Sequence, residues 1–343
     1  MPDLNAIARA IVAERRGILA ADESGGTIAK RFKSIGVEST EANRRAYREL
    51  LFTTSGIGEY ISGVILFDET IRQAAADGTP FVKLLKEQGV IAGIKVDKGA
   101  KPLAAAPGEQ ITEGLDGLRE RLAEYVQLGA QFTKWRAVIA IGQGLPTDHC
   151  IDANAEALAR YAALSQEAGL VPIVEPEVLM DGDHTIERCF AVTEATLHSV
   201  FSALARHRVV LEDMLLKPNM VLSGTTCPQQ ADVQTVATQT VRCFRHAVPA
   251  AVAGIVFLSG GQTNEKATAH LNAMNAMDAA HPWQLSFSYG RALQGPPLKV
   301  WGGDAANVER AKQAFHHRAK CNGAARYGKY TPAMEQGPVG TGA

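Results

Sequence analysis

A lysine interrupts the apolar run at residues 215–221, which reads Leu-Leu-Lys-Pro-Asn-Met-Val. A short apolar run ahead of turn residues predicts a buried strand. A buried ammonium loses its hydration, which lowers the pKa of such a lysine and favours the neutral, nucleophilic amine. Considered alone, Lys217 is more easily explained as the partner of a core carboxylate or as a residue at a strand end in water. The choice between a structural lysine and a nucleophile therefore depends on the other charges in the chain.

Further charges interrupt other apolar stretches of the chain, and most of them lie two residues apart. They are Lys95 with Asp97, Lys134 with Arg136, Glu175 with Glu177, and Asp22 late in an earlier stretch. Side chains two apart on a strand point to the same side. Each charge alone fits a solvated strand end. Charges on five separate strands of a barrel are better explained if they converge inside it, because helices cover the outside.

Such a cluster has the composition of an imine-forming site. Positive charge from Lys95, Lys134 and Arg136 would favour a neutral amine nearby. The carboxylates supply proton transfer, and repulsion among them is expected to raise the pKa of one of them into a useful range. A nucleophilic amine flanked by acid/base groups indicates attack on a carbonyl substrate.

Three stretches favour anion binding. One contains Ser259-Gly260-Gly261, and a second is Ser288-Tyr289-Gly290-Arg291, after the seventh and eighth strands expected below. Barrels often bind phosphate there through backbone N–H groups and a helix start. The Ser-Gly-Gly turn is ordinary by itself, but Arg291 adds a fork of donors. The third stretch holds Ser24, Thr27 and Arg31; a helix N-cap with an exposed arginine explains it equally well.

The elements that must position these groups alternate between short apolar strands and helical patterns. Strands are expected at 17–23, 62–69, 91–97, 132–141, 170–179, 215–221, 254–261 and 283–290. Helices are expected at 4–12, 40–52, 115–128, 153–168, 183–206, 231–246, 264–277 and 304–321. This alternation predicts an α/β fold, a single-domain (β/α)8 TIM barrel over 1–327, with a flexible C-terminal tail at 328–343. A doubly wound open sheet is the alternative, but Ser24-Gly25-Gly26 is too short for its glycine-rich fingerprint.

Composition excludes several classes of function. The chain has 343 residues with a formal net charge of -1, so nucleic-acid binding is not expected. No uninterrupted apolar run approaches the length of a membrane span, and the N-terminus reads as an amphipathic helix. Five scattered cysteines favour free thiols in the cytoplasm. The nine histidines form no His-x-x-x-His or similar ligand pair, and adjacent His316 and His317 lie on different helix faces, so neither a metal nor a cofactor is expected.

From about residue 17 to residue 330 the chain resembles the class I, Schiff-base-forming fructose-1,6-bisphosphate aldolases. The stretches that carry the resemblance are 17–24 (GILAADES), 93–99 (GIKVDKG), 134–136 (KWR), 171–177 (VPIVEPE), 215–220 (LLKPNM), 257–262 (FLSGGQ) and 287–294 (FSYGRALQ). Several long motifs in order make the resemblance specific. It implies reversible cleavage of fructose 1,6-bisphosphate to dihydroxyacetone phosphate and glyceraldehyde 3-phosphate, in glycolysis and gluconeogenesis.

The resemblance also implies a role for each site residue. Lys217 forms the imine, Glu175 is its general acid/base, and Asp22 handles protons at the carbinolamine and at bond cleavage. Lys134 orients and polarises, supported by Glu177 and Arg136, and Lys95 helps to bind substrate. The phosphate nearer the ketone is assigned to Ser259, Gly260 and Arg291, and the far phosphate to Ser24, Thr27 and Arg31; Gly290 is also expected to bind substrate. Relatives are usually homotetramers.

Two departures from the family pattern concern the far phosphate and the chain end. Many relatives carry serine where this chain has Thr27, which retains the hydroxyl. Many end in a tyrosine, whereas this sequence ends Gly-Thr-Gly-Ala, so enamine protonation is expected to rely on barrel groups or water. The remaining alternatives are a Schiff-base aldolase for a sugar with fewer phosphates and a non-catalytic sugar-phosphate sensor.

Overall fold

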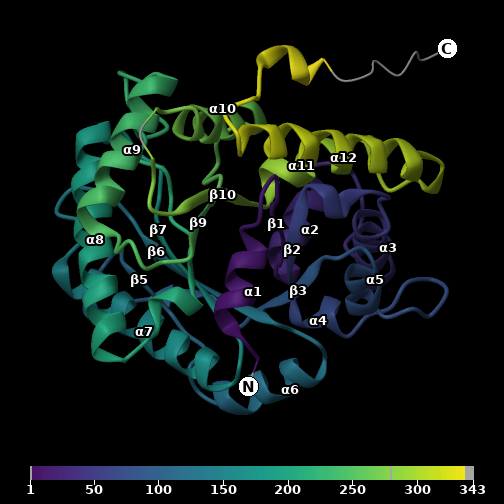
Figure 1. The fold of residues 1–343 in the computed structure, drawn as a ribbon, viewed down its shortest axis with the longest axis horizontal. Helices are drawn as coiled ribbons and strands as arrows, with labels where there is room; N and C mark the ends of the chain where they lie inside the picture. The colour runs from purple at the N-terminus through teal and green to yellow at the C-terminus, as the bar shows by residue number, and fades with distance from the viewer. Residues whose placement is uncertain (1, 279, 337–343) are drawn as a thin grey trace.

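The computed structural model describes residues 2–278 and 280–336, and within them eight parallel strands close into a barrel (Figure 1). Their order around the barrel is β1-β10-β9-β8-β7-β6-β3-β2, so neighbours in sequence are mostly neighbours in space. The strands are β1 (Gly17–Ala21), β2 (Ile61–Leu66), β3 (Ile91–Lys95), β6 (Phe132–Ile139), β7 (Val171–Val178), β8 (Leu215–Leu216), β9 (Gly254–Phe257) and β10 (Gln284–Tyr289). The predicted (β/α)8 barrel is confirmed.

Helices lie between the strands and surround the barrel (Figure 1). They are α1 (Leu4–Ile11), α2 (Gly25–Lys33), α3 (Glu41–Phe52), α4 (Asp68–Ile71), α5 (Phe81–Glu87), α6 (Leu118–Gln127), α7 (Asp148–Glu167), α8 (Ile186–Arg206), α9 (Val233–Ala247), α10 (Asn264–Asn275), α11 (Arg291–Trp301) and α12 (Val308–Ala325). An antiparallel hairpin of β4 (Ala100–Pro102) and β5 (Gln110–Thr112) was not expected, because its short strands are largely exposed and carry no apolar alternation. None of the helices in the described ranges has both the length and the apolar character needed to cross a membrane.

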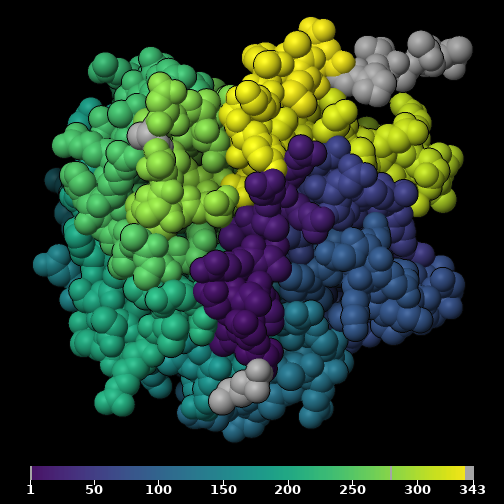
Figure 2. Space-filling model, viewed as in Figure 1, coloured from purple at the N-terminus to yellow at the C-terminus, as the bar shows by residue number. Residues whose placement is uncertain are grey.

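The end of the barrel opposite the site is filled with apolar side chains and covered by α1. Ile11 of α1 and Phe132 of β6 belong to one buried cluster. Phe132 occupies the space beside β3, since a Cβ at Gly93 would lie 2.2 Å from its ring. Glycine at position 93 is therefore required by packing. Figure 2 shows α1, in purple, lying across this face.

Each predicted strand extends beyond the C-terminal end of the strand that the structure shows. Strand β8 differs most, since it covers 215–216 of the predicted 215–221. Lys217 N still donates to Val174 O of β7 at 2.8 Å, but Pro218 has no N–H with which to continue the ladder. The residues beyond the strand ends are therefore loop residues at the barrel mouth, where barrel enzymes place their chemistry.

The first part of the expected tail is packed against the barrel. Tyr330 is buried, and its backbone N–H donates to Asn272 Oδ1 at 2.8 Å. Residues Pro332–Glu335 form the 3-10 helix η4, and Glu335 pairs with Arg318 of α12. The Gly/Pro/Thr-rich composition of 328–343 favours a flexible tail, but composition gives no sign of the ion pair between Glu335 and Arg318. The rest of the expected tail, 337–343, lies outside the described residues.

Candidate active site

A cavity of about 310 Å³ opens at the carboxyl ends of the strands, and charged or polar groups line most of it. The structure brings all fourteen site residues predicted from the sequence to this cavity: Asp22, Ser24, Thr27, Arg31, Lys95, Lys134, Arg136, Glu175, Glu177, Lys217, Ser259, Gly260, Gly290 and Arg291. They come from β3, β6 and β7, from the loops after β1, β8, β9 and β10, and from α2 and α11. This convergence is the one expected if charges on separate strands point inward.

Four charges form a continuous chain of ion pairs in the cavity, which we name the ion chain; Lys134, Glu175 and Lys217 are buried and Asp22 is partly buried. Lys217 Nζ lies 3.1 Å from Glu175 Oε1. Lys134 Nζ lies 3.2 Å from Glu175 Oε2 and 2.7 Å from Asp22 Oδ2. Adjacent strands place these groups, since Lys134 pairs with Ile173 in the β6–β7 register, two residues before Glu175. The amine of Lys217 thus has a carboxylate in reach to take its proton.

The ion chain shifts the pKa values of its carboxylates in one direction. Burial would raise the pKa of Asp22, but Lys134 and Lys217 outweigh it and hold that pKa well below its usual range. The same two lysines lower the pKa of Glu175 against the effect of its burial. Burial would lower the pKa of Lys134, but Asp22 and Glu175 raise it. Repulsion among the carboxylates was expected to raise the pKa of one of them. That expectation is wrong for Asp22 and Glu175, because attraction to the nearby lysines outweighs the repulsion.

Two further ion pairs line the wall above the ion chain. Lys95 Nζ lies 3.2 Å from Asp97 Oδ1, and Arg136 Nε pairs with Glu177. Asp97 Oδ2 also accepts from the backbone N–H of Arg136, at 3.2 Å. Burial would lower the pKa of Arg136, but Glu177 raises it. These contacts hold Lys95 and Arg136 at fixed positions around the cavity.

One anion subsite is built from the loop after β9 and the start of α11. Gly260 and Gly261 have φ angles of +58° and +97°, which favour glycine and turn successive N–H groups in one direction. A Cβ at Gly261 would lie 3.3 Å from Arg291 Nη2, so the guanidinium lies against this loop. Helix α11 begins at Arg291, and its N-cap Gly290 offers no side-chain cap. The start of helix α11, its dipole and Arg291 together favour a phosphate.

A second anion subsite lies at the start of α2. The N-cap Ser24 makes no side-chain cap, and its Oγ lies 3.2 Å from Thr27 Oγ1. Arg31 pairs with Glu23, and a Cβ at Gly290 would lie 3.5 Å from Arg31 Nη2. The simpler interpretation, an N-cap with an exposed arginine, fits less well, because the cap bond is missing and Arg31 is paired at the cavity.

Sequence reasoning missed the groups that hold Arg31 in place. Glu23 is buried and also pairs with Arg48 of α3. Gln294 Nε2 donates to Glu23 Oε1 at 2.8 Å. The only sequence signal was a second carboxylate directly after Asp22, and its partner lies 25 residues away on a helix. Ser288, which lines the cavity, was also missed; within the described ranges its buried Oγ has no hydrogen-bond partner.

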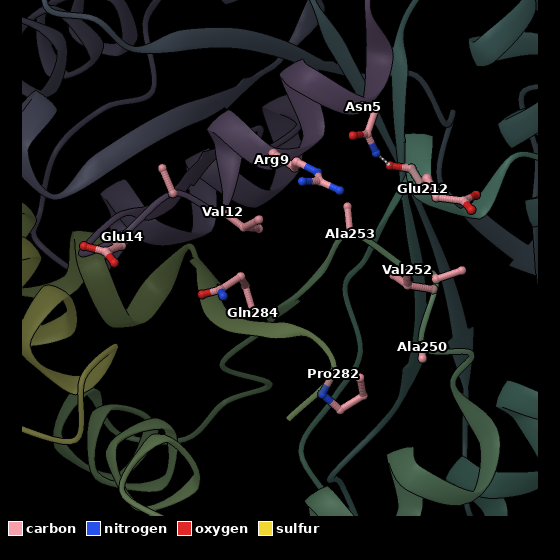
Figure 3. A pocket seen from close by; sticks show the side chains of 12 residues that line it. Asn5, Arg9, Val12, Glu14, Glu212, Ala250, Val252, Ala253, Pro282 and Gln284 are labelled. Atoms are coloured by element: carbon pink, nitrogen blue, oxygen red, sulfur yellow. Dashed lines mark hydrogen bonds between the residues drawn. The ribbon is translucent and has the colours of Figure 1, made fainter. Parts of the chain in front are cut away.

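A larger cavity of about 440 Å³ lies at the other end of the barrel, between α1 and the segments that enter β9 and β10 (Figure 3). Asn5 of α1 donates to the backbone carbonyl of Glu212 at 2.8 Å across it. Among the described residues that line it, Arg9 is the only cation, and the lining contains no lysine. Volume therefore does not identify the site here; the ion chain and the two anion subsites do.

Comparison with known proteins agrees with this geometry. The family model for class I fructose-bisphosphate aldolase matches residues 3–341. A Xanthomonas campestris pathovar campestris protein described as a probable fructose-bisphosphate aldolase class 1 is 61% identical over 324 residues, 94% of this chain and 97% of its own. The Dictyostelium discoideum fructose-bisphosphate aldolase is 54% identical, covering 96% of this chain and 93% of its own.

A solved structure has the same fold. It is the fructose-bisphosphate aldolase of Plasmodium falciparum in complex with TRAP and a small-molecule inhibitor, 50% identical with a TM-score of 0.94, and the match covers 96% of this chain and 95% of that one. The chain therefore belongs to the class I fructose-bisphosphate aldolases, the lyases that cleave fructose 1,6-bisphosphate reversibly, without a metal, through a lysine Schiff base.

Proposed function

We propose that Lys217 is the lysine that forms the Schiff base. The observation that carries this proposal is its buried Nζ, 3.1 Å from Glu175 Oε1 and at the base of the cavity. Transfer of a proton to Glu175 leaves a neutral amine, which attacks the C2 ketone of fructose 1,6-bisphosphate. The carbinolamine then loses water and gives a protonated imine, whose carbon accepts electrons far better than a ketone does.

Glu175 serves as the acid/base of imine formation. In the free enzyme Lys134 and Lys217 hold its pKa low, so it is ionised and ready to accept a proton. Once Lys217 is a neutral carbinolamine nitrogen, one of these two charges is gone and Glu175 retains a proton more easily. That proton goes to the carbinolamine hydroxyl, which leaves as water. The same carboxylate therefore acts as base and then as acid.

Asp22 takes the proton of the C4 hydroxyl in the cleavage step. The electron pair of the broken O–H bond then forms the aldehyde carbonyl at C4. The C3–C4 bond breaks, and its electron pair moves to the protonated imine to give the enamine. Lys134, 2.7 Å from Asp22, keeps that carboxylate ionised and oriented. Glyceraldehyde 3-phosphate leaves; protonation at C3 and hydrolysis release dihydroxyacetone phosphate and restore Lys217. Lys95, Arg136 and Glu177 bind and orient the sugar hydroxyls.

The two anion subsites favour a bisphosphate over a sugar with one phosphate. Ser259, Gly260, Gly290 and Arg291 bind the phosphate nearer the ketone, and Ser24, Thr27 and Arg31 bind the far one. Binding at two fixed points sets which carbon faces Lys217. A sensor on the same barrel would have no need of the ion chain, and a one-phosphate aldolase would have no need of the second subsite.

Removing one arginine from each subsite separates their roles. Arg291→Ala is expected to weaken binding of both fructose 1,6-bisphosphate and dihydroxyacetone phosphate by about 10- to 100-fold, since a hydrogen bond to a charged group contributes about 1.5–3 kcal/mol. Arg31→Ala is expected to weaken only the bisphosphate. Calorimetric titration of both ligands against each variant measures this. Equal losses for both ligands in both variants would contradict the two-subsite assignment.

Cleavage is expected to survive exhaustive chelation, because the electron sink is an imine and not a metal ion. The measurement is steady-state cleavage of fructose 1,6-bisphosphate before and after EDTA treatment and desalting. The rate is expected to change by less than about twofold. Loss of activity that zinc restores, together with failure of borohydride to trap an imine on Lys217, would indicate metal Lewis-acid chemistry and count against the Schiff-base assignment.

A homo-oligomer, a tetramer by family resemblance, is the proposed assembly, and light scattering coupled to size exclusion measures it. A cytoplasmic location is proposed too. Cytosolic fructose-bisphosphate aldolase 6 of Arabidopsis thaliana supports it, at 56% identity over 315 residues, as do five cysteines that are all free and buried.

A further inference from the structure

We propose that His317, Cys321 and Glu335 form a binding site for a zinc-class divalent cation, which joins α12 to the C-terminal segment. One ligand atom from each, an imidazole nitrogen, a thiol sulfur and a carboxylate oxygen, all lie within 4.8 Å of one another. Cys321 is buried and the other two are half-buried. None of the three lines the catalytic cavity, so the ion would be structural rather than catalytic.

The spacing of the two ligands on α12 matches tetrahedral coordination. His317 and Cys321 are four residues apart and therefore on one face of the helix. His317 Nε2 lies 3.7 Å from Cys321 Sγ. Tetrahedral zinc with ordinary Zn–N and Zn–S bond lengths places these two atoms ~3.6 Å apart. In the sequence this pair reads His-x-x-x-Cys, which differs from the usual His-x-x-x-His pattern because the second ligand is a cysteine.

The third ligand comes from η4 and is already held by the fold. Glu335 Oε1 accepts from Tyr330 Oη at 2.7 Å, and Oε2 pairs with Arg318. Each carboxylate oxygen has a second lone pair, so these bonds leave room for an ion. Metal-binding carboxylates are commonly oriented by such outer hydrogen bonds.

Arg318 does not depend on Glu335 alone. Its Nη2 donates to Thr268 Oγ1 at 2.7 Å, so the guanidinium stays anchored if Glu335 shares its charge with an ion. The Cys321 thiolate and the Glu335 carboxylate supply two negative charges. These offset most of the positive charge at the site, which is one from Arg318 and two from the cation. The donor set of nitrogen, sulfur and oxygen is one that zinc accepts and that calcium and magnesium do not favour. Met334 O, 3.8 Å from Cys321 Sγ, or water is available for the fourth position.

Cobalt provides the direct test, because a Co²⁺–thiolate bond absorbs light in the near ultraviolet and tetrahedral Co²⁺ in the visible. EDTA-treated, desalted full-length protein is titrated with CoCl2. The expected result is one Co²⁺ per chain with both bands, and displacement by equimolar ZnCl2. Cys321→Ser should abolish the thiolate band, while Cys243→Ser, at another buried cysteine far along the chain in α9, should leave it unchanged.

Two further variants keep the test decisive if Cys321→Ser fails to fold. His317→Gln and Glu335→Gln should each weaken Co²⁺ binding at least tenfold, and hydrogen exchange of 330–336 should slow with ZnCl2 in the wild type only. A wild type without a thiolate band would overturn the proposal. So would a band that persists in Cys321→Ser, or affinity unchanged in both other variants. Fructose 1,6-bisphosphate cleavage by the treated protein, measured in parallel, reports on the Schiff-base proposal separately.

Discussion

Lys217→Met is expected to lower kcat/KM for fructose 1,6-bisphosphate by about 10⁵-fold or more, the size of effect that follows removal of a covalent nucleophile. Methionine keeps most of the side-chain volume and removes the amine that lies 3.1 Å from Glu175. Lys95 and Lys134 pair with Asp97 and Asp22 and are positioned by other strands, so neither is expected to take the place of Lys217. Steady-state cleavage with a coupled assay measures the loss.

Borohydride trapping identifies the nucleophile without relying on activity. Reduction in the presence of dihydroxyacetone phosphate should convert the imine to a stable amine and add a reduced three-carbon phosphate to Lys217, located by peptide mass mapping. Lys83→Met is the matched control, since this exposed lysine of α5 lies 3.9 Å from Glu87 in a weak surface pair and outside the cavity. An adduct on Lys95 or Lys134 with Lys217 unmodified would refute the assignment.

The sequence was informative about the site because burying charge on strands is costly. Lys217, Lys134 and Glu175 each interrupt an apolar strand pattern, and alternation along a strand fixes which side they face. The barrel followed from eight such strands with helices between them. Strand ends were placed too late because the apolar pattern continues into the loops, whereas ladder hydrogen bonds stop earlier, as at Pro218.

What could not be predicted depends on distances between segments far apart in the chain. The lowered pKa values of Asp22 and Glu175 require knowing that Lys134 lies between them. Likewise, the pairing of Glu23 with Arg48 depends on how α3 packs against the barrel mouth. The packed segment at 328–336 depends in the same way on Arg318, seventeen residues before its partner.

Lys134→Met is expected to destabilise the folded protein by about 3–5 kcal/mol at neutral pH, since removal of one partner leaves a buried charge without compensation. Lys134 is 3% exposed and touches both Asp22 and Glu175. Lys217 still compensates Glu175, so Asp22 loses its direct partner. Cleavage should fall at least 100-fold, because Asp22 then lacks the charge that orients it and keeps it ionised.

The pH dependence of the loss distinguishes electrostatics from packing. In the wild type the folded-state pKa of Asp22 lies below its unfolded value, so its ionisation stabilises the fold above about pH 4 and this contribution disappears as the pH falls through the folded-state pKa. Without Lys134, burial dominates and Asp22 takes up a proton at higher pH. The wild-type advantage in unfolding free energy should therefore be largest near pH 7, shrink as Asp22 of the variant takes up its proton, and shrink further below pH 4.

A double variant tests the same cause at fixed pH. The double variant Asp22→Asn, Lys134→Met no longer contains the uncompensated carboxylate. It should therefore be more stable than Lys134→Met alone by about 1–3 kcal/mol, although each single change removes a native contact. Urea denaturation at pH 7 followed by circular dichroism measures all four proteins of the cycle. If the two single losses simply add, Lys134 stabilises the barrel through its packed side chain, and the ion chain is not the reason that a lysine occupies this position.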